Sequence, residues 1–407
     1  MRKMNLISSE GGPFERGFQH GRSAHDEISQ NIVRFWNAAS AFLPPRDRII
    51  NQFQDRKRVS GIFDDNTLEY LKGIASGSNS QLSDIMALNS FRQFVSPDEC
   101  SVLIAMGDCT TTGSPIVLKN SDKIGSEKFQ GNGFHKFKEI NVVLLEKPDD
   151  THKFVGIAAA GEIAIKMGMN DLGVVAAGNI SRTLDLRQKN PDVTKVRALD
   201  RGVLMRKGVS DASTSREASK LVTAELLDQS MSTPGNVEFV DREDAFLIEG
   251  SYDRISVMQL RNGFVARVNR FELLSNLNDP ENVSSYARYV RANELLQNNK
   301  GRVNAEKMIQ FSKDHANGPG INSICRHDYD FHSETSLSAA VMEVDSSDPK
   351  SSKFHFCLGK PCVAWSEPDC HFVVDMKAQP QDIPERLRNG ESWKKHYTEE
   401  PRIDQSN

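Results

Sequence analysis

The stretch PDECSVLIAMGDCTTTGSPIVLKNSD, residues 97–122, contains two apolar runs with a turn-rich segment between them. Cys100 opens the first run, and Asn120 and Asp122 lie at the end of the second. Short runs of Val, Ile and Leu bounded by Gly, Ser, Thr and Pro predict two buried strands joined by a turn. A packing cysteine fits anywhere along such a run. One at the first position of a strand, beside Glu99, suggests chemistry, with a purely structural cysteine as the alternative.

The chain before this stretch has the residue spacing of helices. Apolar residues recur three and four positions apart over residues 14–35, 68–74 and 85–95. The cluster Asp64-Asp65-Asn66-Thr67 has the residue types that cap the start of a helix. We expect helices across residues 13–97 and no strand before Cys100.

The chain after Cys100 alternates groups of strands with groups of helices. Apolar runs such as INVVLLE, FVGIAAAG and GVVAAGNI precede a helical segment over residues 195–228. The runs NVEFV, AFLIEG, ISVMQL and GFVARVN predict a strand meander. Helices near 285–297 and 305–315 and a final strand pair, SLSAAVMEV and KFHFCLG, follow it. Strands that are apolar throughout need cover on both faces, so this order predicts the α+β class, with sheets between layers of helices.

The composition is that of an ordinary globular protein of 407 residues, with 38% hydrophobic and 26% charged residues. A net charge of -4 and the lack of a basic stripe argue against nucleic acid as a partner. No run approaches the roughly 18 apolar residues of a membrane span, and the first residues lack the apolar segment of a secretory signal. We expect a cytoplasmic protein with neither a membrane nor a nucleic-acid partner.

Six cysteines are too few for a disulfide scaffold in a chain of this length. Cys357, Cys362, Cys370 and His371 have the residue types of a zinc site, in the pattern C-x4-C-x7-C-H. This pattern lacks the paired C-x2-C spacing of zinc knuckles. We expect reduced thiols scattered through the protein, and no metal.

Cys100 needs a base to act as a nucleophile, because a thiol is mostly protonated at neutral pH. The α-amino group of Cys100 becomes such a base if the bond after Glu99 is cut, since its pKa is about 7.7–8.0 in an unperturbed chain. Asp122, at the end of the neighbouring strand, can then hold the ammonium form. A nucleophile paired with its own N-terminal amine is one of the known variants of this chemistry.

A series of further motifs occurs in order along the chain. They are GPFERG with HG (residues 12–21), EYLKGIASG (69–77), DIMALN (84–89), NSD (120–122), GMN with GV (168–174), VNR (268–270) and SICRH (323–327). Together with Cys100, this series resembles the acyl-CoA:6-aminopenicillanate acyltransferase family, a branch of the N-terminal-nucleophile (Ntn) hydrolases. The resemblance spans residues 11–362, and SICRH is its most specific part.

The resemblance implies a four-layer αββα Ntn-hydrolase sandwich that cuts itself before Cys100. Residues 1–99 would form a helical segment separated by the cut, residues 100–375 the αββα core, and residues 376–407 a polar tail. The cleaved fragments would remain associated as a heterodimer. No cofactor is implied, and acyl-CoA enters only as a co-substrate by analogy with the family.

The resemblance also assigns roles to particular residues. Cys100 falls on the nucleophile, Asp122 on the N-x-D motif that follows it, and Asn269 on the asparagine credited with the oxyanion hole. Asn179 falls on a polar position of the site. Arg326 would lower the thiol pKa or bind a substrate carboxylate. The substrate would be a small-molecule N-acyl amide or acyl thioester, hydrolysed or transferred through an acyl-Cys100 intermediate.

Glu99 departs from the family, which usually has glycine before the nucleophile. An N-to-S acyl shift needs a strained and exposed carbonyl, and glycine permits backbone shapes that glutamate resists. The rival hypothesis is therefore a non-catalytic binding protein of the same fold that is never cut. A third hypothesis is a thiol redox or metal protein that uses Cys357, Cys362 and Cys370.

Overall fold

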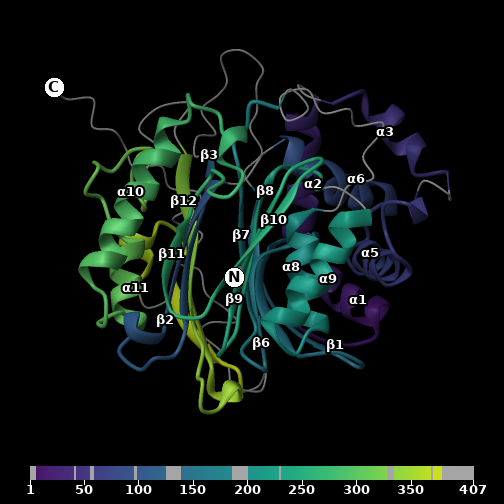
Figure 1. Ribbon diagram of the computed structural model, residues 1–407. Coiled ribbons are helices and arrows are strands. Elements are labelled where there is room, and N and C mark those ends of the chain that lie inside the picture. Colours follow the sequence, from purple (N-terminus) through teal and green to yellow (C-terminus); the bar gives the residue numbers. More distant parts are fainter. Residues whose placement is uncertain are drawn as a thin grey trace.

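Two β-sheets lie face to face between layers of helices in the computed structural model (Figure 1). The structure describes residues 6–40, 43–55, 59–95, 99–124, 139–185, 200–228, 231–327, 334–367 and 370–377. The arrangement of helix, sheet, sheet and helix confirms the predicted α+β class.

The larger sheet has eight strands. In spatial order they are β1 (Leu6–Gly11), β4 (Asn141–Pro148), β5 (Phe154–Ala159), β6 (Ile165–Asn170), β7 (Val175–Ile180), β8 (Gly235–Val240), β9 (Ala245–Gly250) and β10 (Ile255–Leu260). The edge strand β1 pairs in parallel with β4, from Leu6 opposite Val143 to Gly11 opposite Pro148. The other six neighbouring pairs are antiparallel.

The expectation of no strand before Cys100 is wrong, because β1 lies there. Its sequence, LISSEG, is short and half polar, with buried and exposed residues in alternation. Such an edge strand has no continuous apolar run, so its residue pattern does not predict a buried strand.

The smaller sheet has six strands. In spatial order they are β11 (Gly263–Arg267), β2 (Glu99–Met106), β3 (Ile116–Ile124), β12 (Glu334–Glu343), β13 (Lys353–Leu358) and β14 (His371–Asp375). β2 and β3 are the antiparallel pair predicted from residues 97–122. The predicted meander is only partly correct, since β8, β9 and β10 follow one another in the larger sheet while β11 crosses over to pair with β2.

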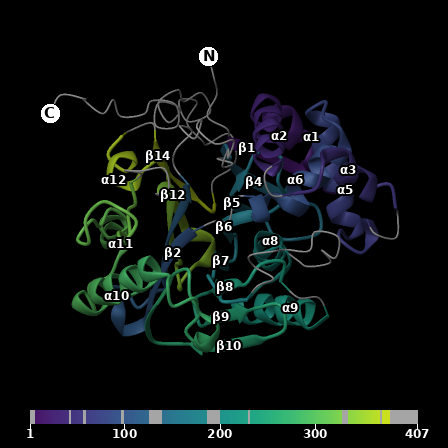
Figure 2. The ribbon, with the colours of Figure 1, turned by 90° about the horizontal axis from the view of Figure 1, so that it is seen from above.

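Helices cover the outer face of each sheet (Figure 2). On the larger sheet's side lie α1 (Pro13–Ser23), α2 (His25–Ala39), α3 (Arg46–Gln52), α5 (Asp65–Gly77), α6 (Leu82–Val95), α8 (Arg201–Asp211) and α9 (Ser215–Asp228). On the smaller sheet's side lie α10 (Val283–Asn298), α11 (Ala305–Ser312) and α12 (Pro361–Ala364). Asp64 caps α5 as its sequence predicts, since its carboxylate accepts a hydrogen bond of 2.7 Å from the Thr67 backbone nitrogen.

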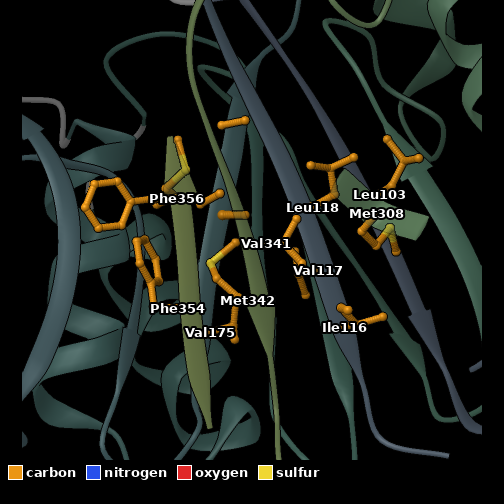
Figure 3. Packing of buried hydrophobic residues seen from close by; sticks show 14 of the residues in the cluster. Leu103, Ile116, Val117, Leu118, Val175, Met308, Val341, Met342, Phe354 and Phe356 are labelled. Carbon is orange, nitrogen blue, oxygen red and sulfur yellow. The ribbon is translucent and has the colours of Figure 1, made fainter. Parts of the chain in front are cut away.

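The largest buried apolar cluster joins the two sheets (Figure 3). It includes Val175 from β7, Val117 from β3 and Met342 from β12. All eight residues of β2 are buried, as expected for a strand covered on both faces. Each such apolar side chain contributes about 1.5–3 kcal/mol when fully buried, so the sheet-to-sheet contact is a main source of stability.

Helices α1 and α5 pack with their backbones in direct contact at glycines. A Cβ added to Gly17 would lie 2.0 Å from the Tyr70 carbonyl oxygen, and one added to Gly73 would lie 2.2 Å from the Phe14 carbonyl oxygen. Gly21 and Gly77 are in equally close contact one turn further along each helix. These glycines belong to the first two motifs of the sequence, which therefore encode a close helix pair.

The described residues end at Lys377, so the polar tail predicted for residues 376–407 lies almost wholly outside them. Met376 is buried and directly follows β14. Among the described residues, no helix combines the length and the apolar character needed to cross a bilayer.

Candidate active site

Cys100 lies at the second residue of β2 and faces the space between the two sheets. It pairs with Ser121 on β3, while Glu99 pairs with Asp122. Side chains alternate along a strand, so Cys100, Ser121 and Lys119 share one face, and Glu99 and Asp122 share the other. Lys119 identifies the first face, because its Nζ donates a hydrogen bond to the Lys166 carbonyl oxygen of the opposite sheet.

The Glu99 carboxylate contacts three arginines on the other face of the smaller sheet. Its Oε2 accepts from Arg326 Nη1 at 2.7 Å and from Arg288 Nη2 at 3.4 Å. Its Oε1 accepts from Arg182 Nε at 3.0 Å and Nη2 at 2.9 Å. Arg288 and Arg326 are almost completely buried, so their contacts with Glu99 form in a region shielded from water, whereas the Arg182 side chain is partly exposed. We call Glu99 with these three arginines the Glu99 clamp.

Asp122 joins the clamp through Arg326 and Ser336. Arg326 Nη1 lies 3.8 Å from Asp122 Oδ2, and the Ser336 hydroxyl donates to Asp122 Oδ1 at 2.6 Å. The same hydroxyl accepts from the Arg326 backbone nitrogen at 2.9 Å. Burial raises the pKa of Asp122, while the guanidinium groups of Arg326 and Arg288 oppose that rise.

Asn269 holds the backbone nitrogen of Cys100. The Cys100 N–H donates to Asn269 Oδ1 at 3.2 Å, and Arg288 Nη2 donates to the same oxygen at 2.8 Å. Asn269 Nδ2 donates to the Ile180 carbonyl oxygen of β7 at 2.9 Å. Asn269 comes just after β11, which pairs with β2, so its side chain links the start of β2 to the opposite sheet.

Arg288 is a central residue of the site that the sequence analysis missed. Its Nη1 donates to the Cys100 carbonyl oxygen at 2.9 Å and to Ser101 Oγ at 3.2 Å. The buried residues of α10 are Ser285, Arg288, Ala292 and Leu296, which recur at helical spacing. An arginine in the buried stripe of a helix is therefore a signal that could have identified it. Arg182, the third arginine of the clamp, follows β7 in a segment without such a pattern.

Asn179 lies on β7 and faces the smaller sheet, next to a small internal cavity. The Asn236 side-chain amide donates to Asn179 Oδ1 and also contacts the carbonyl oxygens of Val268 and Arg270, on either side of Asn269. Asn179 Nδ2 is buried and has no hydrogen-bond partner among the described residues. Asn179 lines the cavity, whose charged lining residues are Arg92, Lys119, Lys166, Asp200 and Arg201.

The structure thus brings most of the predicted site residues together around the first residues of β2. Asp122, Asn269 and Arg326 all connect to Glu99 or Cys100 through the contacts above. Asn179 connects to them through Asn236. In the uncut chain Asn269 holds the Cys100 nitrogen, and the role of Asp122 as partner of a freed amine stays a prediction.

A helix–sheet–sheet–helix sandwich with a cysteine near the start of an inner strand is the architecture of the Ntn-hydrolase class. The chain belongs to the acyl-coenzyme A:6-aminopenicillanic acid acyl-transferase family, whose model matches residues 109–362. The matched region contains Asp122, Asn179, Asn269 and Arg326, and it begins after Cys100. Proteins of this class are enzymes that process acyl amides.

Other similar proteins are more distant. An uncharacterized protein of Archaeoglobus fulgidus is 23% identical over 209 residues, which is 45% of this chain and 34% of that protein. The chain therefore spans about a third of the length of this relative.

Solved structures with some similarity include the Caenorhabditis elegans ortholog of N-acylethanolamine-hydrolyzing acid amidase, at 13% identity and a TM-score of 0.40. The match covers 61% of this chain and 96% of that one. Penicillin V acylase from Agrobacterium tumefaciens has 13% identity and a TM-score of 0.40, over 68% of this chain and 86% of that one. A mutant conjugated bile acid hydrolase from Clostridium perfringens has 11% identity and a TM-score of 0.39, over 70% and 94% respectively. The family membership rests on the match over residues 109–362.

Proposed function

We propose that this protein cuts itself between Glu99 and Cys100 and then hydrolyses or transfers an acyl group through a thioester on Cys100. The observation that supports this most directly is the hydrogen bond from the Cys100 nitrogen to Asn269 Oδ1. It fixes the atom that would become the catalytic amine, on the same residue as the thiol. The substrate would be a small N-acyl amide or acyl thioester.

Self-cleavage would begin with attack of Cys100 Sγ on the Glu99 carbonyl carbon. The C–N bond breaks, the nitrogen takes up the thiol proton, and Glu99 becomes a thioester on Cys100. Water then hydrolyses this thioester, which leaves a carboxylate on Glu99 and restores the thiol. The products are residues 1–99 and a chain that begins with Cys100.

The Glu99 clamp could hold the bond before Cys100 in a geometry suited to cleavage, although Glu99 replaces the glycine that the family usually has there. Arg182, Arg288 and Arg326 fix the Glu99 side chain, and Arg288 also holds the Cys100 carbonyl oxygen. Both sides of the bond to be cut are therefore anchored, so its geometry is set by side chains where the family uses the freedom of glycine.

In the cut protein the α-amine of Cys100 would take the thiol proton and later give it to the leaving group. Asn269 Oδ1 would hold this amine. The buried Asn179 Nδ2, which has no hydrogen-bond partner among the described residues, is the best candidate to donate to the oxyanion. Loss of one such donor costs about 2.7–4 kcal/mol of transition-state stabilisation.

Hydrolysis needs only water, whereas transfer needs a pocket for an acceptor that also excludes water. Acyl-CoA remains a co-substrate only by analogy with the family, and the cytoplasm remains the expected location. Incubation of the purified protein with N-acyl amines and acyl thioesters, with and without an added amine, separates the two reactions. Release of free acid indicates hydrolysis, and a new amide indicates transfer.

The first test is the intact mass of the wild type, of Cys100→Ala and of Cys109→Ser under denaturing conditions. The proposal expects two fragments, cut before Cys100, in the wild type and in Cys109→Ser, and a single chain in Cys100→Ala. A single chain in all three would overturn self-cleavage and favour the alternative, a binding protein of the same fold. A cut elsewhere would contradict the assigned nucleophile.

A further inference from the structure

Four side chains with nitrogen and sulfur donors converge between the loop after α11 and the start of α12. They are His315, Cys325, His327 and Cys362. One donor atom from each lies within 4.8 Å of the donor atoms of the other three. They lie close to the site described above, because Cys325 and His327 flank Arg326 of the Glu99 clamp.

The distances within this group suit a small metal ion. His327 Nε2 lies 3.2 Å from Cys362 Sγ and 4.0 Å from Cys325 Sγ. Zinc has bonds of about 2.3 Å to sulfur and 2.0–2.1 Å to nitrogen, so its tetrahedral ligand atoms lie roughly 3.3–3.8 Å apart. The distance between His327 Nε2 and Cys362 Sγ would widen slightly, and the longer distances, which reach at most 4.8 Å, would shorten by up to about 1 Å to give this geometry.

His315 gives an independent indication of a missing partner. Its ring lies 4.9 Å from that of His327, centroid to centroid, at an interplanar angle of 74°. Its Nε2 is buried, yet no hydrogen-bond partner for it exists among the described residues. Buried polar atoms are rarely left unsatisfied, and a metal bond would use this lone pair. A disulfide between Cys325 and Cys362 would use the two thiols and leave this nitrogen as it is.

We propose that His315, Cys325, His327 and Cys362 bind one Zn²⁺ ion. Two thiolates and two imidazoles in a tetrahedron favour zinc among the common metals. Four protein ligands leave no position for water or substrate, so the ion has a structural role. Binding releases the two thiol protons to solvent.

These four proposed zinc ligands differ from the four residues of the C-x4-C-x7-C-H sequence pattern. The pattern of Cys357, Cys362, Cys370 and His371 shares only Cys362 with them, and no metal was expected from that pattern. The other three ligands come from a loop that precedes Cys362 by more than thirty residues, so their approach depends on the fold.

The ion would act on the site through Arg326. The loop from Lys313 to His327 contains no regular helix or strand. If Cys325 and His327 bind the ion, the backbone is fixed on both sides of Arg326. This makes the four ligands positioning residues for the Glu99 clamp. The proposal does not depend on whether Cys100 is a nucleophile.

The test is the metal content of the full chain, purified without chelators or a metal-affinity step, by plasma mass spectrometry. We expect about one zinc per chain in the wild type and in uncut Cys100→Ala, so a failure of self-cleavage does not affect the measurement. Cys362→Ser and His315→Ala are expected to lose most of the zinc. Cys109→Ser is the matched control and should keep it, because Asp108 Oδ1, 3.5 Å from the Cys109 sulfur, can accept from the new hydroxyl.

Cobalt exchange provides a second measurement on the wild-type chain, which remains decisive if a variant does not fold. Tetrahedral Co²⁺ with thiolate ligands gives intense visible bands and a sulfur-to-metal charge-transfer band, and these are expected here. Reduced protein that takes up neither zinc nor cobalt would overturn the proposal. So would a full equivalent of zinc in folded Cys362→Ser and His315→Ala, or a Cys325–Cys362 disulfide in the protein as isolated.

Discussion

Glu99 is the residue that most changes the interpretation of this chain. The sequence alone suggests that Glu99 disfavours self-cleavage, because the family usually has glycine at this position. In the structure its carboxylate contacts Arg182, Arg288 and Arg326. The glutamate is therefore an anchor for the bond that precedes Cys100, and its substitution should be costly.

We expect Glu99→Gln, made in the Cys100→Ala chain so that no cut intervenes, to lower the free energy of unfolding by about 3–5 kcal/mol. Removal of one member of a buried ionic group leaves its partners without compensation. Urea denaturation measures the change. The matched control is Glu69→Gln, whose carboxylate pairs with Lys72 at the surface. An exposed pair contributes about 1 kcal/mol or less. Equal losses in the two variants would contradict the role given to the clamp.

Glu238 on β8 gives the fold a pH dependence. Burial raises the pKa of its carboxyl group to about 8, and Arg267 and Lys119 oppose the rise. Neither carboxyl oxygen has a hydrogen-bond partner among the described residues. The folded chain therefore keeps a proton that the unfolded chain loses near its ordinary pKa of about 4.3. The stability that the protonated Glu238 carboxyl contributes is fully present below the unfolded-state pKa of about 4.3, and it is lost as the pH rises toward the folded-state pKa of about 8.

We expect Glu238→Gln to become more stable relative to the wild type as the pH rises from about 5 to 8, by up to about 1.4 kcal/mol per pH unit. Thermal unfolding at a series of pH values measures the difference. Exposed Glu294 provides the control, and Glu294→Gln should show no such trend. A constant offset between Glu238→Gln and the wild type would show that the Glu238 carboxyl titrates normally.

At the scale of elements, the contact between α1 and α5 depends on glycines that face a neighbouring backbone. A Cβ at Gly73 would meet the Phe14 carbonyl oxygen at 2.2 Å, and backbone cannot move aside as a flexible side chain can. We expect Gly73→Ala to destabilise the protein by about 1–3 kcal/mol or more, although alanine favours helices. Gly320→Ala is the control, because a Cβ there meets no atom within 4 Å. A melting temperature unchanged in Gly73→Ala would refute the close contact.

The elements predicted from sequence are those whose pattern is local. β2, β3, the capped start of α5 and the final strand pair follow from runs of apolar residues and from turn and cap residues. β1 was missed because an edge strand is stabilised by its partner β4, whose paired residues lie 137 positions further along the chain. The sequence predicts β11 as the last strand of a meander, whereas it pairs with β2 in the other sheet, because pairing partners are set by long-range contacts that periodicity does not encode.

The same distinction applies to the candidate site. Asp122 and Asn269 were found because they belong to motifs of the resembled family, and the structure places both at the start of β2. Arg182 and Arg288 belong to no such motif. Their contacts with Glu99 span 83 and 189 residues of chain, so only the fold shows that these arginines meet Glu99.

At the scale of the whole molecule, the described residues before Cys100 are part of the sandwich. β1 pairs with β4 along its full length, and α1 packs on β1 and α5. A cut before Cys100 would therefore leave two chains with one shared sheet and one shared core. The heterodimer of associated fragments stays a prediction that depends on this cut.

We expect the two fragments to elute together in size-exclusion chromatography under native conditions and to separate only in denaturant. The hydrogen bonds of the β1–β4 pair and the apolar contacts of α1 and α5 must break before they part. The uncut Cys100→Ala chain provides the reference elution volume. Elution of the N-terminal fragment by itself in native buffer would contradict a shared sheet.

The residues of the Glu99 clamp are translated at widely separated times, so the clamp can form only late in synthesis. A chain still growing on the ribosome contains Glu99 and Cys100 long before it contains Arg326, which lies 227 residues beyond Glu99. Asn269 and Arg288 are likewise translated late. Nascent chains halted before Arg326 emerges would lack the contacts that hold the bond in place. Any maturation at Cys100 would then wait until Arg326 has emerged, and it would report that the region containing Asn269, Arg288 and Arg326 has already folded.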